Sequence, residues 1–594
     1  MSESKQGTST VADLIVERLA AHTDHLFGVG GANIEDLYDA VHRHPTLTGL
    51  IAKHEFGAAT MADGYARATN RLGVVAATSG GGAMNLLAAL TESFDSRVPV
   101  LALVGQPPTA LEGRGAFQDT SGLPGRLDAR RIFGAVSRYC AKVTSPEDIS
   151  DELDRAIDAA LGGGPAVLLL PKDIQATALP RHSGAPLAGI QRGGVDPGQK
   201  HAGMTGEVHA GMTRGAHATV TGGSRGGMTE VARAAVEAVV ADLPVRARVV
   251  IIAGPEVGLV DARAELAALA RAMDAKVLVT PDAKDAFPNR DPHFAGVVGV
   301  MGHPGAGDLV ATADLCLLAG ASMSMTARAG LDGPLAACAR VVHVGAEDPF
   351  VHTHARACGP LAPTLREVAA LISTDSVVPQ PDPAVSEPRA ALPELSVPPV
   401  SGPGVRYREA VAALESALEP GTDVVADAGN TGAAVVHHLR VPEDGRFLIA
   451  LGMGGMGYSF GAGIGCALGR GGRTVVIAGD GAYFMHGHEV HTAVEYQVPV
   501  TFVIFNNNAH AMCVTREQVY YSGDYSFNRF RAAEIGSGVA AMFPELPTWT
   551  ARTLTEFENA LEKARAIPGP VFIELQCDPD EIPPFAPFLK EPLA

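Results

Sequence analysis

The sequence has little of three things: cysteine, charged residues and long apolar runs. Its seven cysteines are scattered singly over 594 residues, and none belongs to a CxxC pair. This excludes a disulfide-rich scaffold and a clustered thiolate metal site, and it is typical of reduced thiols in a cytoplasm. No run of 18 apolar residues occurs, and the first twenty residues are polar and then amphipathic. We therefore expect neither a membrane span nor a signal peptide.

Charged residues make up only 19% of the chain, and acids outnumber bases to give a formal net charge of -19. A surface of this sign repels nucleic acid and anionic membranes, so neither is expected as a partner. A small anionic substrate responds to the local field at its site and is not excluded. The composition predicts a soluble, cytoplasmic enzyme with large buried sheets.

The chain is too long for one hydrophobic core. Apolar runs alternate with helix-like segments in three blocks, at 1–178, 230–373 and 405–594. We expect an α/β protein in which each block forms a doubly wound parallel sheet. Segments 179–229 and 374–404 separate the blocks.

Within each block the apolar runs are four to eight residues long and end at glycine, proline or a polar residue, as buried parallel strands do. The expected strands are HLFGV (25–29), GLIAK (49–53), LGVVAATSG (72–80), VPVLALVG (98–105), AVLLLP (166–171), RVVIIAG (248–254), KVLVTPDA (276–283), DLCLLAG (314–320), RVVHVG (340–345), DVVADAGN (423–430), FLIALG (447–452), TVVIAGDG (474–481), VTFVIFNNN (500–508) and VFIELQ (571–576). Ligands of such sheets bind at the carboxyl ends of the strands.

Segment 179–229 is rich in glycine, histidine, methionine and proline, and HAGMTGEV at 201–208 is nearly repeated at 209–216. This composition favours a flexible linker or insertion. A histidine and methionine metal patch is the alternative, although no strand or helix is expected there to fix ligand geometry.

The stretch Gly452–Gly457 matches G-x-G-x-x-G, follows an expected strand and precedes an expected helix. Asp480 lies 23 residues beyond it, so the pattern nearly fulfils the fingerprint of a dinucleotide site. A dinucleotide site, however, does not require the asparagines 506–508, which end the next expected strand.

A divalent cation held against a diphosphate does need both features. Mg²⁺ prefers six oxygen ligands, some of them from phosphate. Asp480 would supply a carboxylate oxygen, Asn507 an amide oxygen and Ala509 a backbone carbonyl. Gly479 and Gly481 flank Asp480 and allow the backbone to approach the phosphates closely.

The motif GDG, then 24 residues, then NNN resembles the thiamine-diphosphate-dependent enzymes. The resemblance covers nearly the whole chain and implies a pyrimidine-binding, a central and a diphosphate-binding domain, in that order. It also implies thiamine diphosphate and Mg²⁺ as cofactors. Finally, it implies a homodimer or homotetramer whose active sites lie between two chains.

His54-Glu55 in the first block supports the same resemblance. In the family such a glutamate protonates N1′ of the aminopyrimidine, after which the imino group removes the C2 proton of the thiazolium. Taken alone, Glu55 would be read as a first-turn carboxylate stabilised by its helix dipole.

Single residues extend the resemblance. Gly454 matches the carbonyl that accepts a hydrogen bond from the 4′-amino group, and Met456 matches the apolar residue that holds the cofactor bent. The remaining matches are Asn430 and Thr431 for the diphosphate, and Gly80 and Asn85 in the loop beside the pyrimidine.

Three segments align without gaps with segments of one group in this family: GVVAATSGGGAMN (73–85), GQPPTALEGRGAFQDT (105–120) and NNNAHAMCVTREQVYYSGDYS (506–526). The chain therefore resembles the acetolactate synthases most. Phe117 and Gln118 match a segment at their active site, although loop packing explains this pair equally well. Simple decarboxylases protonate the reacting carbon with an acid or a histidine in the first glycine loop and a neighbouring pair of histidines. Here loop 28–33 reads GVGGAN, with small, non-ionisable residues where the acid would stand. This favours a carboligase, which decarboxylates a 2-oxo acid such as pyruvate and passes the acyl fragment to a carbonyl acceptor. A simple decarboxylase and a non-catalytic subunit of the same family are the alternatives.

Three positions depart from acetolactate synthases. Arg516 replaces a tryptophan that helps select the acceptor, and it either pairs with an anionic group on the substrate or lies on the surface. His510 replaces an apolar residue and is a candidate acid or base. The central block reads AGASMSMTARAG at 319–330 where flavin-binding synthases carry a different arginine-containing stretch, which speaks against FAD.

Overall fold

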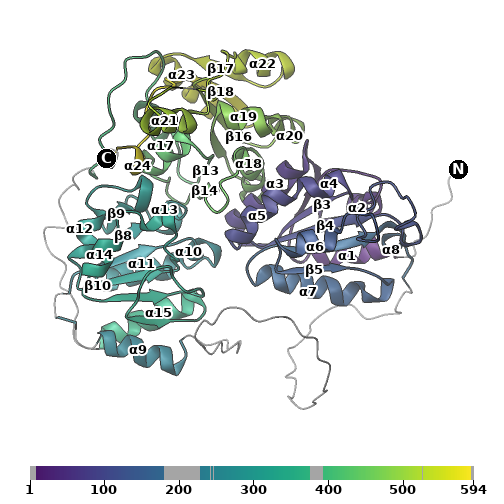
Figure 1. Cartoon of the computed structure of the whole chain (residues 1–594), viewed down its shortest axis with the longest axis horizontal. Coiled ribbons are helices and arrows are strands. Elements are labelled where there is room, and N and C mark those ends of the chain that lie inside the picture. The colour runs from purple at the N-terminus through teal and green to yellow at the C-terminus, as the bar shows by residue number, and fades with distance from the viewer. Residues whose placement is uncertain are drawn as a thin grey trace.

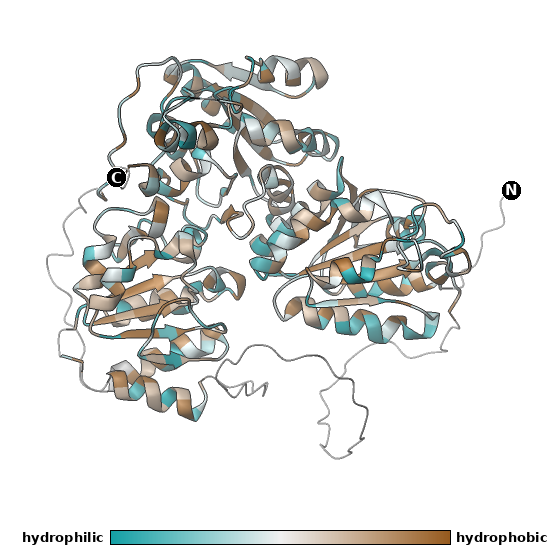
Figure 2. Cartoon of the chain, in the orientation of Figure 1, coloured by the Kyte–Doolittle hydropathy of each residue, from teal (hydrophilic) through white to brown (hydrophobic). Residues whose placement is uncertain are grey.

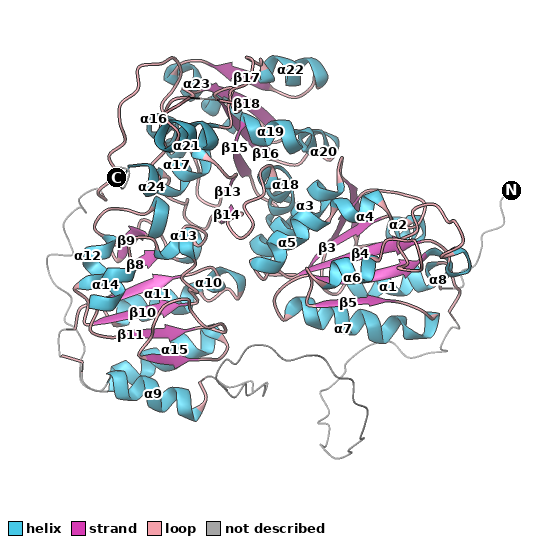
Figure 3. Ribbon diagram, viewed as in Figure 1, coloured by secondary structure: helices cyan, strands magenta, loops and turns pink. Residues whose placement is uncertain are grey.

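The computed structural model describes residues 9–179, 228–240, 243–244, 247–374, 392–524 and 526–589. They form three sheets of six strands, and every strand pairs in parallel with its neighbours (Figures 1 and 3). The predicted α/β class with three parallel sheets is confirmed. The histidine- and methionine-rich repeat of the predicted segment 179–229 lies outside the described residues.

The N-terminal sheet has the strand order β2-β1-β3-β4-β6-β5. Its strands are β1 (His25–Gly28), β2 (Thr48–Ile51), β3 (Gly73–Ala77), β4 (Val100–Gln106), β5 (Tyr139–Lys142) and β6 (Ala166–Pro171). Its helices are α1 (Val11–Leu19), α2 (Glu35–Arg43), α3 (Glu55–Thr69), α4 (Gly81–Asn85), α5 (Leu87–Asp95), η1 (Thr109–Leu111), α6 (Ala129–Gly134), η2 (Pro146–Asp148), α7 (Ile149–Leu161) and α8 (Lys172–Gln175).

The central sheet has the order β12-β11-β10-β7-β8-β9. Its strands are β7 (Val249–Ala253), β8 (Lys276–Val279), β9 (Phe294–Val297), β10 (Leu315–Ala319), β11 (Val341–Val344) and β12 (Ala355–Ala357). Its helices are α9 (Glu230–Val240), α10 (Glu256–Leu259), α11 (Arg263–Ala272), η3 (Lys284–Ala286), η4 (Gly299–Met301), α12 (Ala306–Ala311), α13 (Met325–Arg328), α14 (Asp332–Ala337) and α15 (Leu361–Thr374).

The C-terminal sheet has the order β14-β13-β15-β16-β18-β17. Its strands are β13 (Asp423–Ala426), β14 (Phe447–Ile449), β15 (Thr474–Gly479), β16 (Val500–Asn506), β17 (Thr548–Ala551) and β18 (Val571–Gln576). Its helices are α16 (Tyr407–Ala417), α17 (Asn430–His438), α18 (Tyr458–Arg470), α19 (Asp480–His486), η6 (Gly487–Glu489), α20 (Val490–Glu495), α21 (Ala511–Tyr520), α22 (Ile535–Met542), α23 (Leu554–Arg565) and α24 (Ala586–Leu589).

Helices cover both faces of the sheets, so inner strands such as β4 and β16 are buried at every residue. Strands are correspondingly apolar, while the outer side of α7 is polar (Figure 2). The sequence analysis missed β5, β9, β12 and β17, and all four lie at sheet edges. None of the described helices is long and apolar enough to cross a membrane.

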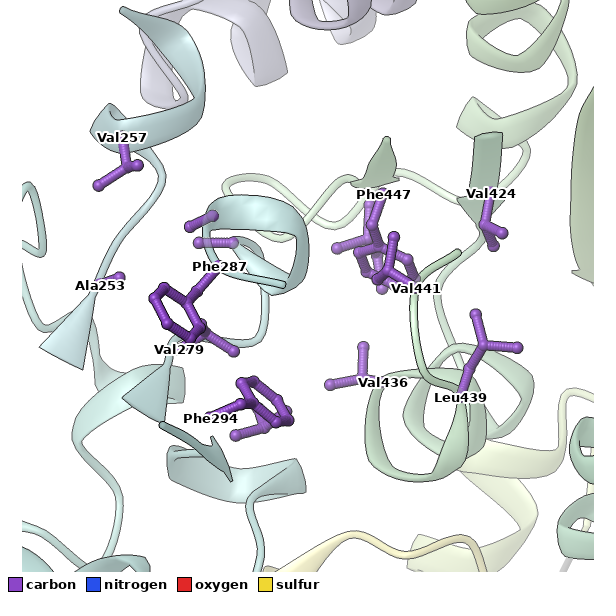
Figure 4. Packing of buried hydrophobic residues seen from close by; sticks show 14 of the residues in the cluster. Ala253, Val257, Val279, Phe287, Phe294, Val424, Val436, Leu439, Val441 and Phe447 are labelled. Carbon is purple, nitrogen blue, oxygen red and sulfur yellow. The ribbon is translucent and has the colours of Figure 1, made fainter. Parts of the chain in front are cut away.

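The central and C-terminal domains share one hydrophobic core. Phe287 and Phe294 of the central domain belong to the same buried cluster as Val436 and Phe447 of the C-terminal domain (Figure 4). Lys284 of the central domain reaches into the C-terminal domain, where its buried ammonium donates hydrogen bonds to carbonyls in the last turn of α17. A cation at this helix end is favourable because the last carbonyls carry partial negative charge.

The N-terminal and C-terminal domains meet where α3 packs against α18 (Figure 1). A Cβ atom on Gly465 would lie 1.9 Å from the carbonyl oxygen of Met61, and one on Gly64 would lie 2.2 Å from that of Ala462. Both atoms that block these positions belong to the backbone. Glycine on each helix is therefore required for this close approach.

We predict that Gly465→Ala destabilises the protein by about 1–3 kcal/mol, because the added methyl group forces the two helices apart. Gly538→Ala is the matched control, since Gly538 lies inside α22 and no atom beyond its own chain neighbours and helix backbone lies within 4 Å of its Cβ position. Removing this helical glycine should raise stability by roughly 0.5–1 kcal/mol. Urea unfolding of both variants checks the pair, and equal effects would contradict the close packing.

Candidate active site

The candidate metal ligands meet at the carboxyl ends of two neighbouring strands. Asp480 follows β15 and begins α19, while Asn507 follows β16, which pairs with β15. The backbone N–H of Ala509 donates to Asp480 Oδ2 at 3.1 Å and to Asn507 Oδ1 at 3.1 Å. The structure thus brings the three predicted residues together around a single amide.

Asp480 is buried, with 1% of its surface exposed. Burial raises the pKa of Asp480 to about 7, although the N–H groups of Gly481 and Ala509 oppose the shift. No group of three or more His, Cys, Asp or Glu side chains that could hold a metal ion occurs among the described residues. A cation at Asp480 would therefore need amide, carbonyl and diphosphate oxygens as its other ligands, and this donor set suits Mg²⁺.

Tyr407, which the sequence analysis missed, sets the orientation of Asn507. The side-chain amide of Asn507 donates to the Tyr407 hydroxyl at 3.1 Å, so its oxygen faces Ala509. Tyr407 is fully buried at the start of α16. No motif marks it, because it lies 100 residues away in sequence.

The predicted diphosphate residues Asn430 and Thr431 form the first turn of α17, directly after Gly429, whose φ is 100°. The N–H groups of a first helical turn have no partner within the helix and readily bind phosphate. The side-chain oxygen of Asn430 is buried without a hydrogen-bond partner. Gly479 approaches Thr431 from β15, since its Cβ position lies 3.7 Å from the threonine hydroxyl. These features fit a diphosphate.

Met456 and His510 both approach Gly481. A Cβ atom on Gly481 would lie 2.5 Å from His510 Cδ2 and 3.1 Å from Met456 Cε, so only glycine fits between them. The ring of His510 packs edge-on against Phe530, with centroids 4.6 Å apart. Gly454 lies in the same loop as Met456 and has a positive φ of 68°.

A second group forms in the N-terminal domain. Glu55 begins α3, and the Asn85 side chain donates to its Oε2 at 2.9 Å. Gly80 lies against Gln118, and the hydroxyl of Thr78 donates to Gln118 Oε1 at 3.5 Å. Glu55, Asn85, Gly80 and Gln118 thus line one edge of the N-terminal sheet.

Glu489 of the C-terminal domain holds the backbone that immediately precedes Glu55. Its buried carboxylate accepts hydrogen bonds from the backbone N–H groups of Lys53, at 3.0 Å, and His54, at 2.9 Å. Phe56 stacks on His486, with ring centroids 4.0 Å apart. Glu489 and His486 were not expected from the sequence. They could be suspected only because they lie on the helical segment that Asp480 begins.

Two predicted substrate residues are exposed. Phe117 has 79% of its surface exposed in the loop before Gln118. Arg516 is exposed on α21, the helix that His510 precedes.

The hydrogen bonds of Glu55 and of Asp480 run to residues of their own domains.

The central sheet has a cavity of about 140 Å³ at its carboxyl edge, which is the edge at which such a sheet would bind a flavin. Its arginines are already paired: Arg97 with Glu256 at 3.6 Å and Glu347 at 3.3 Å, and Arg263 with Asp285 at 2.6 Å. The third, Arg67, pairs with two acids of the N-terminal domain. None of these three arginines is left without an acidic partner, so none offers an unpaired guanidinium to the phosphates of FAD.

Three family models match successive parts of the chain. They are described as "Thiamine pyrophosphate enzyme" with the N-terminal TPP binding domain at residues 9–123, the central domain at 236–370 and the C-terminal TPP binding domain at 427–575. The C-terminal match contains Asp480 and Asn507, and the N-terminal match contains Glu55.

Curated relatives span almost the whole chain. The probable acetolactate synthase large subunit of Methanocaldococcus jannaschii is 26% identical over 600 residues, covering 97% of this chain and 93% of the relative. The acetolactate synthase large subunit of Haemophilus influenzae is 25% identical over 584 residues, covering 96% and 95%. Sulfoacetaldehyde acetyltransferase of Alcaligenes xylosoxydans is 26% identical over 566 residues, covering 89% and 85%. With the three domains in place and relatives along nearly its full length, the chain belongs to the thiamine pyrophosphate enzymes and is acetolactate synthase-like.

Proposed function

We propose that the chain decarboxylates a 2-oxo acid and transfers the acyl fragment to a carbonyl acceptor, with pyruvate as the first donor to test. The acetolactate synthase relatives and the thiamine pyrophosphate domains support a carboligase. The observation that carries the proposal is the meeting of Asp480, Asn507 and Ala509 at the sheet edge beside the first turn of α17.

Thiamine diphosphate, when bound, supplies the carbon that bonds to the carbonyl carbon of the donor, and it takes up the electron pair of the bond that breaks when CO₂ leaves. The residues of the chain bind and orient it. Asn430 and Thr431 would hold the diphosphate through the first turn of α17, and Asp480, Asn507 and the Ala509 carbonyl would hold Mg²⁺.

Glu55 would exchange a proton with the pyrimidine ring, and Asn85 fixes the carboxylate that does so. Met456 would support the bent cofactor from the opposite domain. We propose that the protein is a homodimer or homotetramer in which Glu55 of one chain and Asp480 of another serve the same cofactor.

Loop 28–33 supports carboligation over release of an aldehyde. It carries no ionisable side chain, and its only polar one, Asn33, donates to the Ser79 hydroxyl at 2.7 Å. A positioned acid accelerates proton transfer by typically 10²–10⁴-fold, so its absence from this loop leaves time for a second carbonyl to react. The paired arginines of the central cavity support activity without FAD.

The proposed reaction predicts an acyloin or a 2-acyl-2-hydroxy acid as the main product from pyruvate. Mass spectrometry of reactions with pyruvate and a panel of aldehydes and 2-oxo acids, with and without FAD, measures the distribution. Free acetaldehyde as the dominant product in the presence of a good acceptor would overturn the carboligase assignment. It would favour the simple decarboxylase instead.

Arg516 is proposed to pair with an anionic group on the acceptor. A charge-assisted hydrogen bond contributes about 1.5–3 kcal/mol, so Arg516→Trp should weaken use of an anionic acceptor by roughly 10- to 150-fold. Use of a neutral aldehyde and decarboxylation of the donor should change much less. Arg516→Lys retains the charge and should recover part of the loss. Competition between a 2-oxo acid and an aldehyde measures the ratio, and an unchanged ratio in Arg516→Trp would dismiss the pairing.

A further inference from the structure

The loop between β14 and α18, residues 452–457, carries Gly454 and Met456. The family resemblance assigns Gly454 to the 4′-amino group of the pyrimidine, and the proposed function has Met456 support the bent cofactor. Its first three residues are exposed, and Met453 has 60% of its surface exposed. Gly454 and Gly457 have positive φ values of 68° and 83°. A loop so rich in glycine has many accessible conformations, so its working conformation needs outside support.

Buried carboxylates hold both ends of this loop. At its start, Glu92 accepts hydrogen bonds from the backbone N–H of Met453 at 2.7 Å and of Gly452 at 3.3 Å. At its end, Asp427 accepts from the N–H of Gly457 at 2.9 Å and of Ser459 at 2.9 Å. Asp427 precedes α17 in the same domain, whereas Glu92 lies on α5 of the N-terminal domain.

Glu92 is itself held in place by charged and polar groups. Arg67 of α3 lies 3.3 Å from its Oε1, and the Ser96 hydroxyl donates to the same oxygen at 2.8 Å. Burial would raise the pKa of Glu92, but Arg67 and the N–H groups of the loop lower it below its ordinary value. The carboxylate is therefore charged at neutral pH, and both of its oxygens accept.

Arg67 ties this contact to the helix that Glu55 begins. Its guanidinium pairs with Asp63 at 2.6 Å, and Asp63 also accepts from the Ser93 and Tyr458 hydroxyls. Asp63, Glu92 and Ser93 are all at least 97% buried. Charge-assisted bonds with this degree of burial hold their partners in one geometry.

We propose that Glu92 is a positioning residue, which fixes residues 452–457 so that Gly454 and Met456 meet the pyrimidine ring of the cofactor. The inference rests on the proposed function, because that function places the ring against this loop. Glu92 touches neither cofactor nor substrate in this account and acts through the two N–H groups. The N-terminal domain thus shapes the cofactor loop of its own chain in addition to carrying Glu55.

Glu92→Gln tests this role, because the amide has one acceptor oxygen and would turn an N–H group toward a backbone donor. Glu256→Gln is the matched control. Glu256 is also a buried carboxylate at a domain joint, accepts from the N–H of Ala346 at 3.1 Å and faces Arg97, but it lies in the central domain. Glu92→Asp keeps the charge opposite Arg67 with a shorter reach, and it carries the same test if Glu92→Gln does not fold.

Amide hydrogen exchange of the cofactor-free protein is the first readout. Exchange in the peptide that spans 452–457 should rise by about tenfold or more in Glu92→Gln and stay unchanged in Glu256→Gln. The second readout is exchange of the C2 proton of bound thiamine diphosphate, which should slow by at least about tenfold while calorimetric affinity changes less, since the diphosphate contacts persist.

Unchanged loop protection and C2 exchange in Glu92→Gln would overturn the proposal, as would equal losses in both variants. Failure of the proposed function is distinguishable from this result. If the wild-type protein exchanges the C2 proton but forms no carboligation product, the proposed carboligase function is wrong. The positioning role of Glu92 is then still decided by loop protection and C2 exchange.

Discussion

Helix α3 lies so close to α18 that carbonyl oxygens of each helix occupy the places where side chains of the other would begin. This contact joins the sheet that carries Glu55 to the sheet that carries Asp480. It also brings Glu92 of the N-terminal domain to the loop at 452–457. On the other side of the contact, Glu489 accepts a hydrogen bond from the backbone just before Glu55. The relative placement of these groups within one chain therefore depends on a packing that only glycine permits on both helices.

The buried carboxylates around this joint differ in how their charge is compensated. Glu92 has Arg67 and two backbone N–H groups, and its pKa is lowered. Asp480 has backbone N–H groups, which do not offset its burial, and its pKa rises to about 7. An uncompensated buried carboxylate is costly, and a divalent cation would remove that cost. The burial of Asp480 therefore supports the proposal that a divalent cation binds at the end of β15.

The inner strands were predictable because both of their faces are buried, which makes them continuous apolar runs. Of the four missed edge strands, β5 and β17 are partly exposed and carry polar residues, β12 has only three residues, and β9 is buried but contains Gly296. Asp480, Asn507 and Glu55 stand in recognisable motifs. Tyr407, Glu92 and Glu489 act across long separations in sequence, so no local pattern could reveal them.

We propose that Glu55 of one chain and Asp480 of another complete one cofactor site, and mixing two inactive variants tests this proposal most directly. In a dimer of Glu55→Gln with Asp480→Ala, one site carries both changes and the other carries neither. Random exchange makes half of the dimers mixed, and half of their sites are intact, so activity should recover to about a quarter of wild type. Demonstrated subunit exchange with no recovery of activity would contradict the shared site.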